Sequence, residues 1–320
     1  MKKWIALMLC AVLVSGALCG CGGERRQDTD KIQVVATVFP LYDWARELIG
    51  QRREQVELTL LLDHGVDMHS YQPSVEDMIK VSDCDVFIYV GGESDQWVDD
   101  ALGEAANQDM IAANLLELLG TAAKEEETVE GMEQEEEDGE ETAYDEHIWL
   151  SLRNASLLCR ALADVFAAAD PDGAAVYRAN AAAYIRKLEA LDNAYQEAVD
   201  SAGGKTVLVA DRFPFRYLAD DYGLTYYAAF AGCSAQAEAS FETVVFLAQK
   251  IDALGLRYIL QTETADGTLA QTVRGNTAAG DQTVLTLDSM QSVTAQDAAA
   301  GTTYLTVMEN NLRVLKEALQ

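Results

Sequence analysis

The segment Ala174–Asp200, AAVYRANAAAYIRKLEALDNAYQEAVD, contains neither proline nor glycine and decides how the chain is organised. At 1.5 Å per residue, a helix over these residues would extend for about 40 Å. It lies between two regions rich in predicted strands. A helix of this length exceeds what a crossover between neighbouring strands needs, so the segment predicts a linking helix between two α/β halves.

Before this helix, short β-branched runs alternate with segments of helical periodicity. The run from Ile32 to Val38 ends at Phe39-Pro40 and predicts a buried strand. The other elements predicted in this half are helices over residues 41–49 and 74–81 and strands over residues 56–62 and 86–90. Alternating strands and helices predict a parallel sheet with helices on both faces.

After His147 the sequence first becomes helical and then returns to alternation. Residues 154–169 are rich in alanine, with apolar positions at a 3.6-residue period, and Asp170-Pro171-Asp172-Gly173 ends this helix. Beyond the linking helix, we expect strands over residues 206–210, 258–262 and 284–287 and helices over residues 216–222, 241–254 and 304–319.

The predicted fold class is α/β, with two lobes of mostly parallel sheets flanked by helices and joined by one long rigid linking helix. The expected domains are a lipoprotein signal peptide (1–20), a tether (21–31), an N-terminal α/β lobe (32–150) with an acidic loop (124–144), a helical segment with the linking helix (151–204) and a C-terminal α/β lobe (205–320).

The N-terminus predicts a lipid-anchored location. Lys2 and Lys3 precede an apolar run too short to span a bilayer, and Leu18-Cys19-Gly20-Cys21 resembles a bacterial lipobox with Cys21 as the lipidated residue. A plain secretory signal is the alternative. We therefore expect the mature chain to lie outside the cytoplasm, anchored by lipid to the outer face of the cell membrane.

Charge excludes nucleic acid as a partner. The net charge is −30, and loss of the two leader lysines would make it −32. One acidic segment runs from Glu125 to Glu141, and its composition predicts a solvated, mobile loop. Cys84, Cys159 and Cys233 have neither the spacing of a disulfide framework nor that of a metal cluster, so they are interpreted as small buried side chains.

Two of the three histidines lie in segments that are typical of metal ligands. His69 begins His-Ser-Tyr-Gln-Pro, and His147 lies in Asp-Glu-His-Ile-Trp-Leu. Neutral imidazole is a common zinc ligand, although a lone histidine is more often an ordinary cleft or surface residue. His64 lies in no comparable motif and remains without an assigned role.

Four segments in order together resemble the zinc and manganese substrate-binding lipoproteins of ABC importers. They are His69-Ser-Tyr-Gln-Pro-Ser, Asp145-Glu-His-Ile-Trp-Leu-Ser, Asp170-Pro with Tyr177 and Asn180, and Tyr217-Leu-Ala-Asp-Asp-Tyr-Gly-Leu. The resemblance covers residues 32–320. It implies a cleft that binds a divalent metal, zinc in preference to manganese, and a permease as partner. We expect a monomer.

The resemblance implies His69 and His147 as the first two metal ligands. The family's third ligand, a histidine five residues before Tyr217, is Arg212 here, and a guanidinium cannot coordinate a cation. We hypothesise that Asp211 supplies the ligand and that Arg212 points away or pairs with an acid; alternatively Asp211 caps the turn that follows. Glu263 is the expected fourth ligand.

Two other functions remain open from sequence alone. A surface lipoprotein of the adhesin type, with the same fold but no bound transition metal, is favoured by Arg212. A zinc hydrolase is less favoured, because the chain has no His-Glu-x-x-His motif. The sequence therefore predicts a binding protein and not an enzyme.

Overall fold

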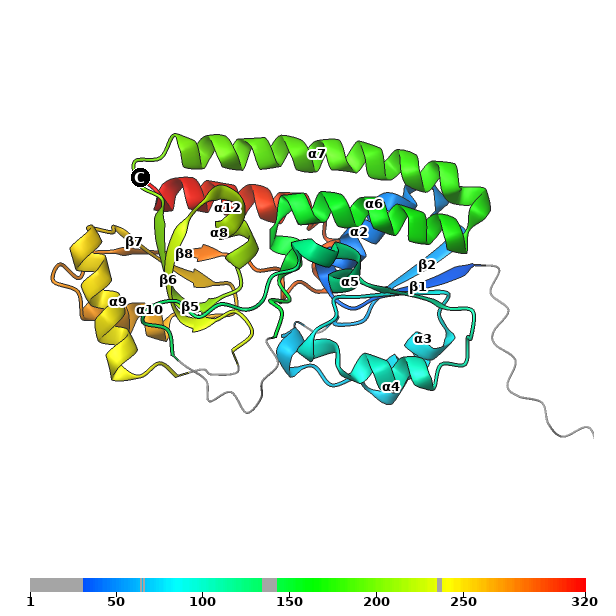
Figure 1. Cartoon of the computed structure of the whole chain (residues 1–320), viewed down its shortest axis with the longest axis horizontal. Coiled ribbons are helices and arrows are strands. Elements are labelled where there is room, and N and C mark those ends of the chain that lie inside the picture. Colours follow the sequence, from blue (N-terminus) through cyan, green and yellow to red (C-terminus); the bar gives the residue numbers. More distant parts are fainter. Residues whose placement is uncertain (1–30, 64, 66, 134–142, 235–237) are drawn as a thin grey trace, which may run out of the picture. The chain divides into compact units, whose positions relative to one another are not determined.

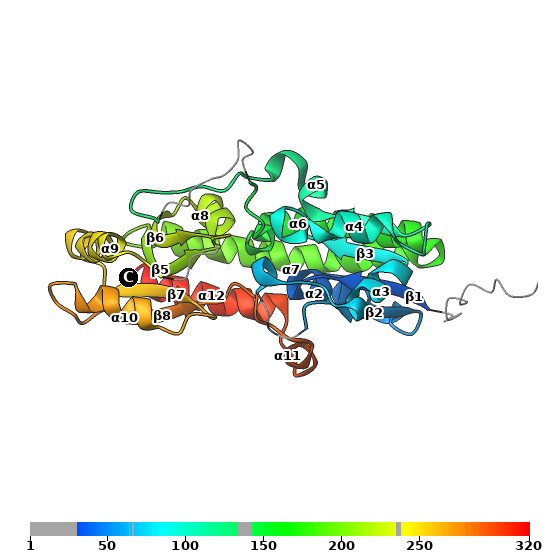
Figure 2. The ribbon, with the colours of Figure 1, turned by 90° about the horizontal axis from the view of Figure 1, so that it is seen from below.

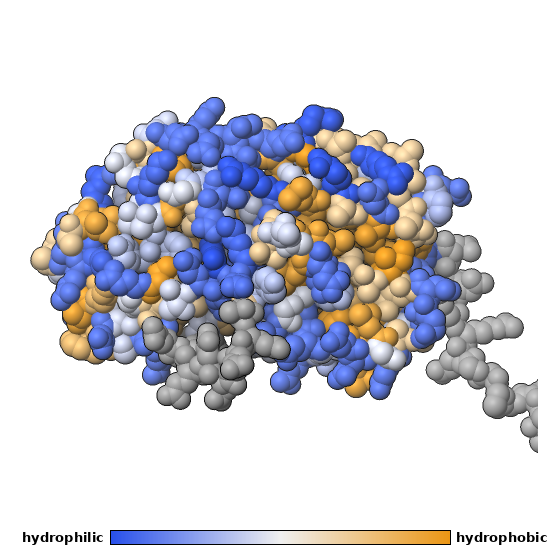
Figure 3. Space-filling view, viewed as in Figure 1, coloured by the Kyte–Doolittle hydropathy of each residue, from blue (hydrophilic) through white to orange (hydrophobic). Residues whose placement is uncertain are grey.

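The computed structural model describes residues 31–63, 65, 67–133, 143–234 and 238–320, and residues 31–320 form one compact unit. The predicted signal peptide, Cys21 and His64 lie outside the described residues. Among the described residues, no helix has the length and apolar character needed to cross a membrane. Figure 3 shows hydrophilic and apolar residues interspersed over the visible face of both lobes.

The first lobe contains a parallel four-stranded sheet in the order β2-β1-β3-β4. Its strands are β1 (Ile32–Ala36), β2 (Val56–Leu60), β3 (Val86–Tyr89) and β4 (Ile111–Asn114). Its helices are α2 (Phe39–Ile49), α3 (Val75–Asp83), α4 (Trp97–Gly103), α5 (Leu115–Leu119) and α6 (Leu152–Ala169). Helices α2 and α6 cover one face of the sheet, and α3 and α4 lie on the other (Figure 1).

The second lobe repeats this arrangement in the order β6-β5-β7-β8, again all parallel. Its strands are β5 (Thr206–Phe213), β6 (Thr225–Ala231), β7 (Tyr258–Thr262) and β8 (Thr283–Leu287). Its helices are α8 (Arg216–Tyr222), α9 (Phe241–Leu254), α10 (Thr268–Gly275), α11 (Ala295–Ala299) and α12 (Tyr304–Ala318). The predicted fold class is confirmed.

In each sheet the chain reverses its strand order at one point, between β1 and β3 and between β5 and β7. Ligands of open α/β sheets bind outside the carboxyl ends of the strands at such points. Figure 2 shows the two sheets in line, with α7 beside both of them. The fold therefore predicts a site where the carboxyl ends of the two sheets approach each other.

Helix α7 (Ala174–Asp200) has the predicted bounds and packs against helices of both lobes, α2 and α6 in the first and α8 and α12 in the second (Figure 1). Tyr195 on its buried face donates a hydrogen bond to the Met308 carbonyl oxygen of α12 (2.7 Å). One apolar core also runs continuously through both lobes. A continuous core opposes wide separation of the lobes, so we expect local adjustment on ligand binding.

Asp43 in α2 provides a test of this shared core. Its fully buried carboxylate accepts a hydrogen bond from Tyr304 N (2.7 Å) at the start of α12 and pairs with Arg46. Burial outweighs these two contacts and raises the pKa of Asp43 from 3.8 to about 6. An acid with a raised pKa binds more protons in the folded state, so its contribution to stability falls as pH rises through this range.

The substitution Asp43→Asn removes this pH-dependent cost while keeping an oxygen acceptor for Tyr304 N. We compare the difference in unfolding free energy between variant and parent at two pH values. This difference should be about 2 kcal/mol more favourable to the variant at about pH 7.5 than at about pH 4.5. Denaturant unfolding in the presence of a chelator measures it. Asp200→Asn, at an exposed pair with Lys205, is the control. Equal pH dependence in both variants would show that burial of Asp43 is not the cause.

The acidic segment contacts the rest of the protein over residues 124–133. Glu126 N donates to the Ala143 carbonyl oxygen (2.8 Å), and Glu133 N donates to the Ala229 carbonyl oxygen of β6 (2.9 Å). Lys250 of α9 pairs with Glu130 (2.9 Å). These residues therefore contact the second lobe while Glu125, Glu127 and Glu130 stay exposed, and the mobility of the loop stays a prediction. Residues 134–142 lie outside the described residues.

Candidate metal centre

His69 is positioned by a short turn that follows β2. It lies in the 3₁₀ helix η2 (Met68–Ser70), where Asp67 caps the turn by accepting a hydrogen bond from His69 N (3.0 Å). Met68 anchors the turn in the core. The backbone of His69 is thus fixed before any ligand binds, as a metal site requires.

His147 is fully buried at the start of the 3₁₀ helix η5 (Ile148–Leu150), whose three side chains are themselves fully buried. Asp145 Oδ1 accepts hydrogen bonds from His147 N (2.9 Å) and from His147 Nδ1 (3.0 Å). An ionised carboxylate can only accept, so Nδ1 carries the proton and Nε2 keeps its lone pair. A carboxylate behind a histidine in this way orients metal-binding imidazoles.

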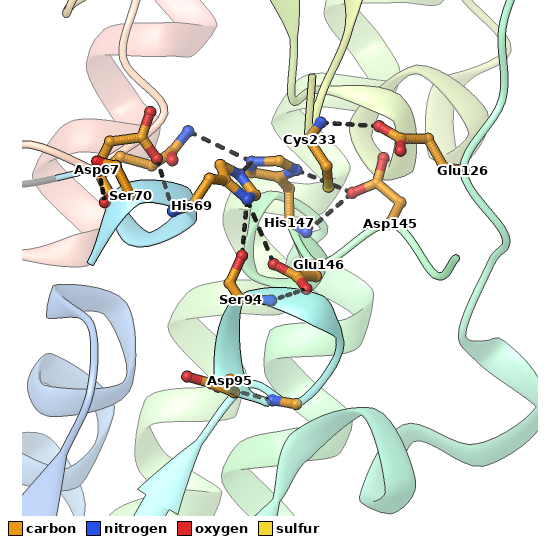
Figure 4. Close-up of polar contacts among 12 residues, drawn as sticks. Asp67, His69, Ser70, Ser94, Asp95, Glu126, Asp145, Glu146, His147 and Cys233 are labelled. Atoms are coloured by element: carbon orange, nitrogen blue, oxygen red, sulfur yellow. Dashed lines mark hydrogen bonds and ion pairs between the residues drawn. The ribbon is translucent and has the colours of Figure 1, made fainter. Parts of the chain in front are cut away.

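The two imidazoles face each other across a short gap (Figure 4). His69 Nε2 lies 3.2 Å from His147 Nε2, while His69 Nδ1 lies 2.8 Å from Ser94 Oγ and 3.5 Å from Glu146 Oε2. Two nitrogen ligands of a tetrahedral zinc ion are separated by about 3.3 Å, given Zn–N bonds of about 2.05 Å. The separation of the two Nε2 atoms therefore fits that of two nitrogen ligands of one zinc ion.

Burial and the neighbouring charges move the pKa values of the two imidazoles in opposite directions. Burial and then the charge of His147 lower the pKa of His69 to about 4. Burial also opposes a proton on His147, but the hydrogen bond and charge of Asp145 outweigh it and raise the pKa of His147. Burial thus disfavours the charged form of His69, whereas Asp145 favours the charged form of His147.

Asp145 offers a prediction that leaves both histidines in place. Asp145→Asn weakens the orientation of the His147 ring and removes a charge, so zinc affinity should fall by about 10- to 100-fold. Competition titration with a chromophoric chelator measures the change. Asp220→Asn, at a surface pair with Lys124, is the control and should bind as the parent does. An affinity for Asp145→Asn equal to that of the control would rule out this orienting role.

Cys233 joins the histidines from the second lobe, on the loop that follows β6. One ligand atom each from His69, His147 and Cys233 lie within 4.8 Å of one another. Burial, and then the charges of Asp145 and Glu126, raise the pKa of this thiol far above its usual range. Sequence spacing missed Cys233, because only the fold brings this loop to the histidines.

The two predicted carboxylate ligands are engaged with their own lobe. Asp211 Oδ1 accepts from Arg212 N (2.9 Å), and Asp211 Oδ2 accepts from Thr262 N (3.0 Å) and Thr262 Oγ1 (2.5 Å). Glu263 accepts from Ser289 N (2.7 Å), Ser289 Oγ (2.9 Å) and Gln291 N (3.1 Å). In the part of the chain that the structure describes, neither joins the cluster of His69, His147 and Cys233. A ligand role for each stays a prediction.

Arg212 connects the lobes at this site. Its Nη1 lies 2.8 Å from Asp67 Oδ2, while the other oxygen of Asp67 caps the turn of His69. The register of β5 against β6 shifts between Val209 and Arg212. Arg212 thus pairs with an acid, as one form of the sequence hypothesis stated. Both residues of the pair line a cavity of about 270 Å³ between the lobes.

Gln291 is a second residue that sequence reasoning missed. Its Nε2 lies 3.3 Å from His147 Nε2, and its Oε1 is buried without a hydrogen-bond donor among the described residues. The preceding residue, Met290, has φ of 65°, a strained value for a side chain other than glycine. Glu263 holds this turn by accepting hydrogen bonds from the backbone N of Ser289 and Gln291. The prediction of Glu263 therefore selected a residue that contacts Gln291.

Two parallel α/β lobes, joined by a long helix and with two imidazoles facing each other near their junction, have the architecture of a two-lobe substrate-binding protein. The sequence matches the family described as zinc-uptake complex component A, periplasmic, over residues 34–318, and the chain belongs to that family. The resemblance identified from the sequence motifs is confirmed.

Relatives in this family carry names that concern zinc. The chain is 34% identical over 320 residues to the zinc-binding lipoprotein AdcA of Streptococcus pneumoniae, covering 99% of this chain and 61% of AdcA. It is 28% identical over 330 residues to the high-affinity zinc uptake system protein ZnuA of Bacillus subtilis, covering 99% and 98%. The chain thus spans about three-fifths of AdcA and nearly all of that ZnuA.

Solved structures agree with this assignment. The Zn(II)-bound ZnuA-like domain of Streptococcus pneumoniae AdcA superposes with a TM-score of 0.71 at 30% identity, covering 90% of this chain and 99% of that domain. The metal-dependent lipoprotein YcdH of Bacillus subtilis gives a TM-score of 0.73 at 24% identity, covering 90% and 99%. The second likeness shows the fold.

Proposed function

We propose that this protein is the extracytoplasmic substrate-binding component of an ABC importer, which captures zinc between its lobes and delivers it to a membrane permease. The observation that carries the proposal is the pair of Nε2 atoms of His69 and His147, which face each other at 3.2 Å. The names of the relatives AdcA and ZnuA support zinc as the cargo.

In this proposal His69 and His147 bind the metal directly. Asp211 and Glu263 were predicted to complete the site from the second lobe, and each would have to exchange its present hydrogen bonds to do so. Gln291 requires less movement, because rotation of its amide by about 180° would direct Oε1 instead of Nε2 towards the histidines. In the absence of rearrangement, Glu263 acts through Gln291 by fixing its turn.

Zinc is preferred over manganese for a chemical reason. Imidazole nitrogen suits zinc, whereas manganese favours carboxylate, carbonyl and water oxygens and a higher coordination number. The carboxylates of the second lobe near the site already accept hydrogen bonds from the protein. The donor atoms that remain available are therefore mainly those that zinc favours.

The proposed mechanism is capture and release without chemical change to the cargo, so no catalytic residue is assigned. The shared core restricts lobe movement, and binding would proceed through local adjustment around Arg212 and Gln291. We further propose that Cys21 anchors the chain by lipid to the outer face of the cell membrane, that residues 21–31 act as a tether, and that the protein works as a monomer.

A metal titration of the full chain tests the proposal. Zinc, manganese and calcium are offered in competition with chelators of known affinity, and zinc should bind at one equivalent, well below micromolar Kd and more tightly than manganese. Failure to bind zinc below micromolar Kd would remove the importer function. It would favour instead the surface lipoprotein of adhesin type, which the cationic Arg212 beside the histidines makes the second candidate.

A further inference from the structure

Cys233 is a second-lobe residue that lies close to the histidine pair. It follows β6 on a short loop, is partly buried, and stands beside His147 in Figure 4. Its sulfur belongs to a cluster with one nitrogen from each histidine, in which every pair of atoms lies within 4.8 Å. Ligand atoms of three residues from two lobes therefore lie in one cluster.

The backbone at Cys233 is held by Glu126. Cys233 N donates a hydrogen bond to Glu126 Oε1 (2.7 Å). Glu126 N in turn donates a hydrogen bond to the Ala143 carbonyl oxygen (2.8 Å), in the segment that leads to the His147 motif. This gives the first part of the acidic segment a structural role. Through Glu126 it holds the backbone of Cys233 near the residues that orient His147.

Gly232 allows this close approach. A Cβ atom at Gly232 would lie 3.0 Å from the Phe213 carbonyl oxygen and 3.1 Å from His147 Nδ1. Contacts that short would push the loop away from the buried ring. The glycine therefore lets the backbone before Cys233 rest directly against the imidazole.

We propose that the sulfur of Cys233 is the ligand by which the second lobe binds zinc, giving a site of His69, His147 and Cys233. This inference rests on the proposed function. A nitrogen and a sulfur ligand of tetrahedral zinc lie about 3.6 Å apart, so the cluster, with its ligand atoms within 4.8 Å of one another, would need to tighten by local side-chain adjustment. On binding, the thiol proton passes to solvent and the thiolate forms the zinc–sulfur bond.

This set of ligands would account for a preference for zinc and for the absence of the family's third histidine at position 212. Thiolate and imidazole together favour zinc over manganese, which prefers oxygen. The two histidines come from the first lobe and the thiolate from the second, so one ion would connect the lobes. Arg212 cannot be a ligand. Cys233, on a neighbouring loop, would then supply the donor of the second lobe.

Cobalt(II) titration of the full chain, under reducing conditions, tests the proposal, since cobalt takes zinc sites and its spectrum reports the ligands. The parent should show visible bands of four-coordinate cobalt and a near-ultraviolet sulfur-to-cobalt charge-transfer band, both saturating at one equivalent. Cys233→Ser should lose the charge-transfer band and bind zinc about 10- to 100-fold more weakly. Cys233→His should recover most of the affinity without that band.

Cys84→Ser is the matched control, because this buried cysteine donates to the Val81 carbonyl oxygen (3.2 Å) in the first lobe and should leave the spectrum unchanged. Visible bands without charge transfer in the parent, or a charge-transfer band that survives Cys233→Ser, would overturn Cys233 as a ligand and leave the proposed function standing. The absence of all cobalt bands and of zinc binding in the parent would overturn both.

Discussion

Replacing His69 with alanine is expected to weaken zinc binding by at least about 100-fold, or about 2.7 kcal/mol. His69 supplies one of two facing Nε2 atoms, and its loss leaves His147 as the remaining imidazole in the cluster. His69 lies on a short surface turn capped by Asp67, so the fold should tolerate the change. Competition titration with zinc gives the affinity, and thermal unfolding with chelator checks the fold.

Ser70→Ala provides the control on the same turn. The Ser70 hydroxyl donates to the Asp67 carbonyl oxygen (3.1 Å) and is exposed, so its removal should leave zinc affinity unchanged. His147→Ala should match His69→Ala in affinity, although it also empties a fully buried position and should lower stability. Binding by His69→Ala as tight as by the parent would show that the facing imidazoles do not hold the metal.

Replacing Arg212 with histidine is expected to strengthen zinc binding by about 10- to 100-fold. The guanidinium contributes to the low pKa of His69, so its positive charge is felt at the site, and it would oppose a divalent cation in the same way. Its removal also frees Asp67, with which it pairs at 2.8 Å. A histidine at this position would add a neutral nitrogen donor from the second lobe.

Arg212→Met separates the two effects. It removes the charge without adding a ligand and should strengthen zinc binding by only about 10-fold, through reduced repulsion. A further gain in Arg212→His is then due to ligation. Isothermal calorimetry of the parent and both variants measures these steps. Weaker binding in both variants would mean that the link between Arg212 and Asp67 supports the site and does not oppose the cation.

Much of the fold could be predicted because strong local signals agree with it. Helix α7 has the predicted bounds, since no proline or glycine interrupts residues 174–200 and Pro171 and Gly173 lie just before it. The strand β4 was not predicted, because Ile111-Ala-Ala-Asn is too short and too rich in alanine to show a strand pattern. Strand β6 (TYYAAFA) was not predicted either, and Cys233 follows it.

The convergence of the two first-lobe histidines was predictable from the sequence, whereas the contacts of the second-lobe side chains were not. His69 and His147 lie within motifs, so their convergence follows from a resemblance that spans the chain. Asp211 was hypothesised to supply the ligand in place of its neighbour Arg212, but its carboxylate accepts hydrogen bonds from Thr262 of β7. Whether a side chain at the end of a strand faces the cleft depends on packing between lobes and on local register, which one sequence does not contain.

The acidic segment also shows that amino-acid composition does not predict which carboxylates contact the rest of the protein. Its charge density predicts exposure, whereas Glu126 and Glu133 accept backbone hydrogen bonds from Cys233 and Ser240 of the second lobe. Carboxylates can cap loops as well as face solvent, and only the tertiary structure distinguishes the two.

The central claim is that one zinc ion binds between the imidazoles of His69 and His147. A crystal structure of the zinc-loaded protein, with anomalous diffraction measured above and below the zinc absorption edge, tests it most directly. We expect one anomalous peak per chain within about 2.0–2.1 Å of Nε2 of both residues. Saturation with zinc and no such peak between these two atoms, or a peak held by other residues, would contradict the claim.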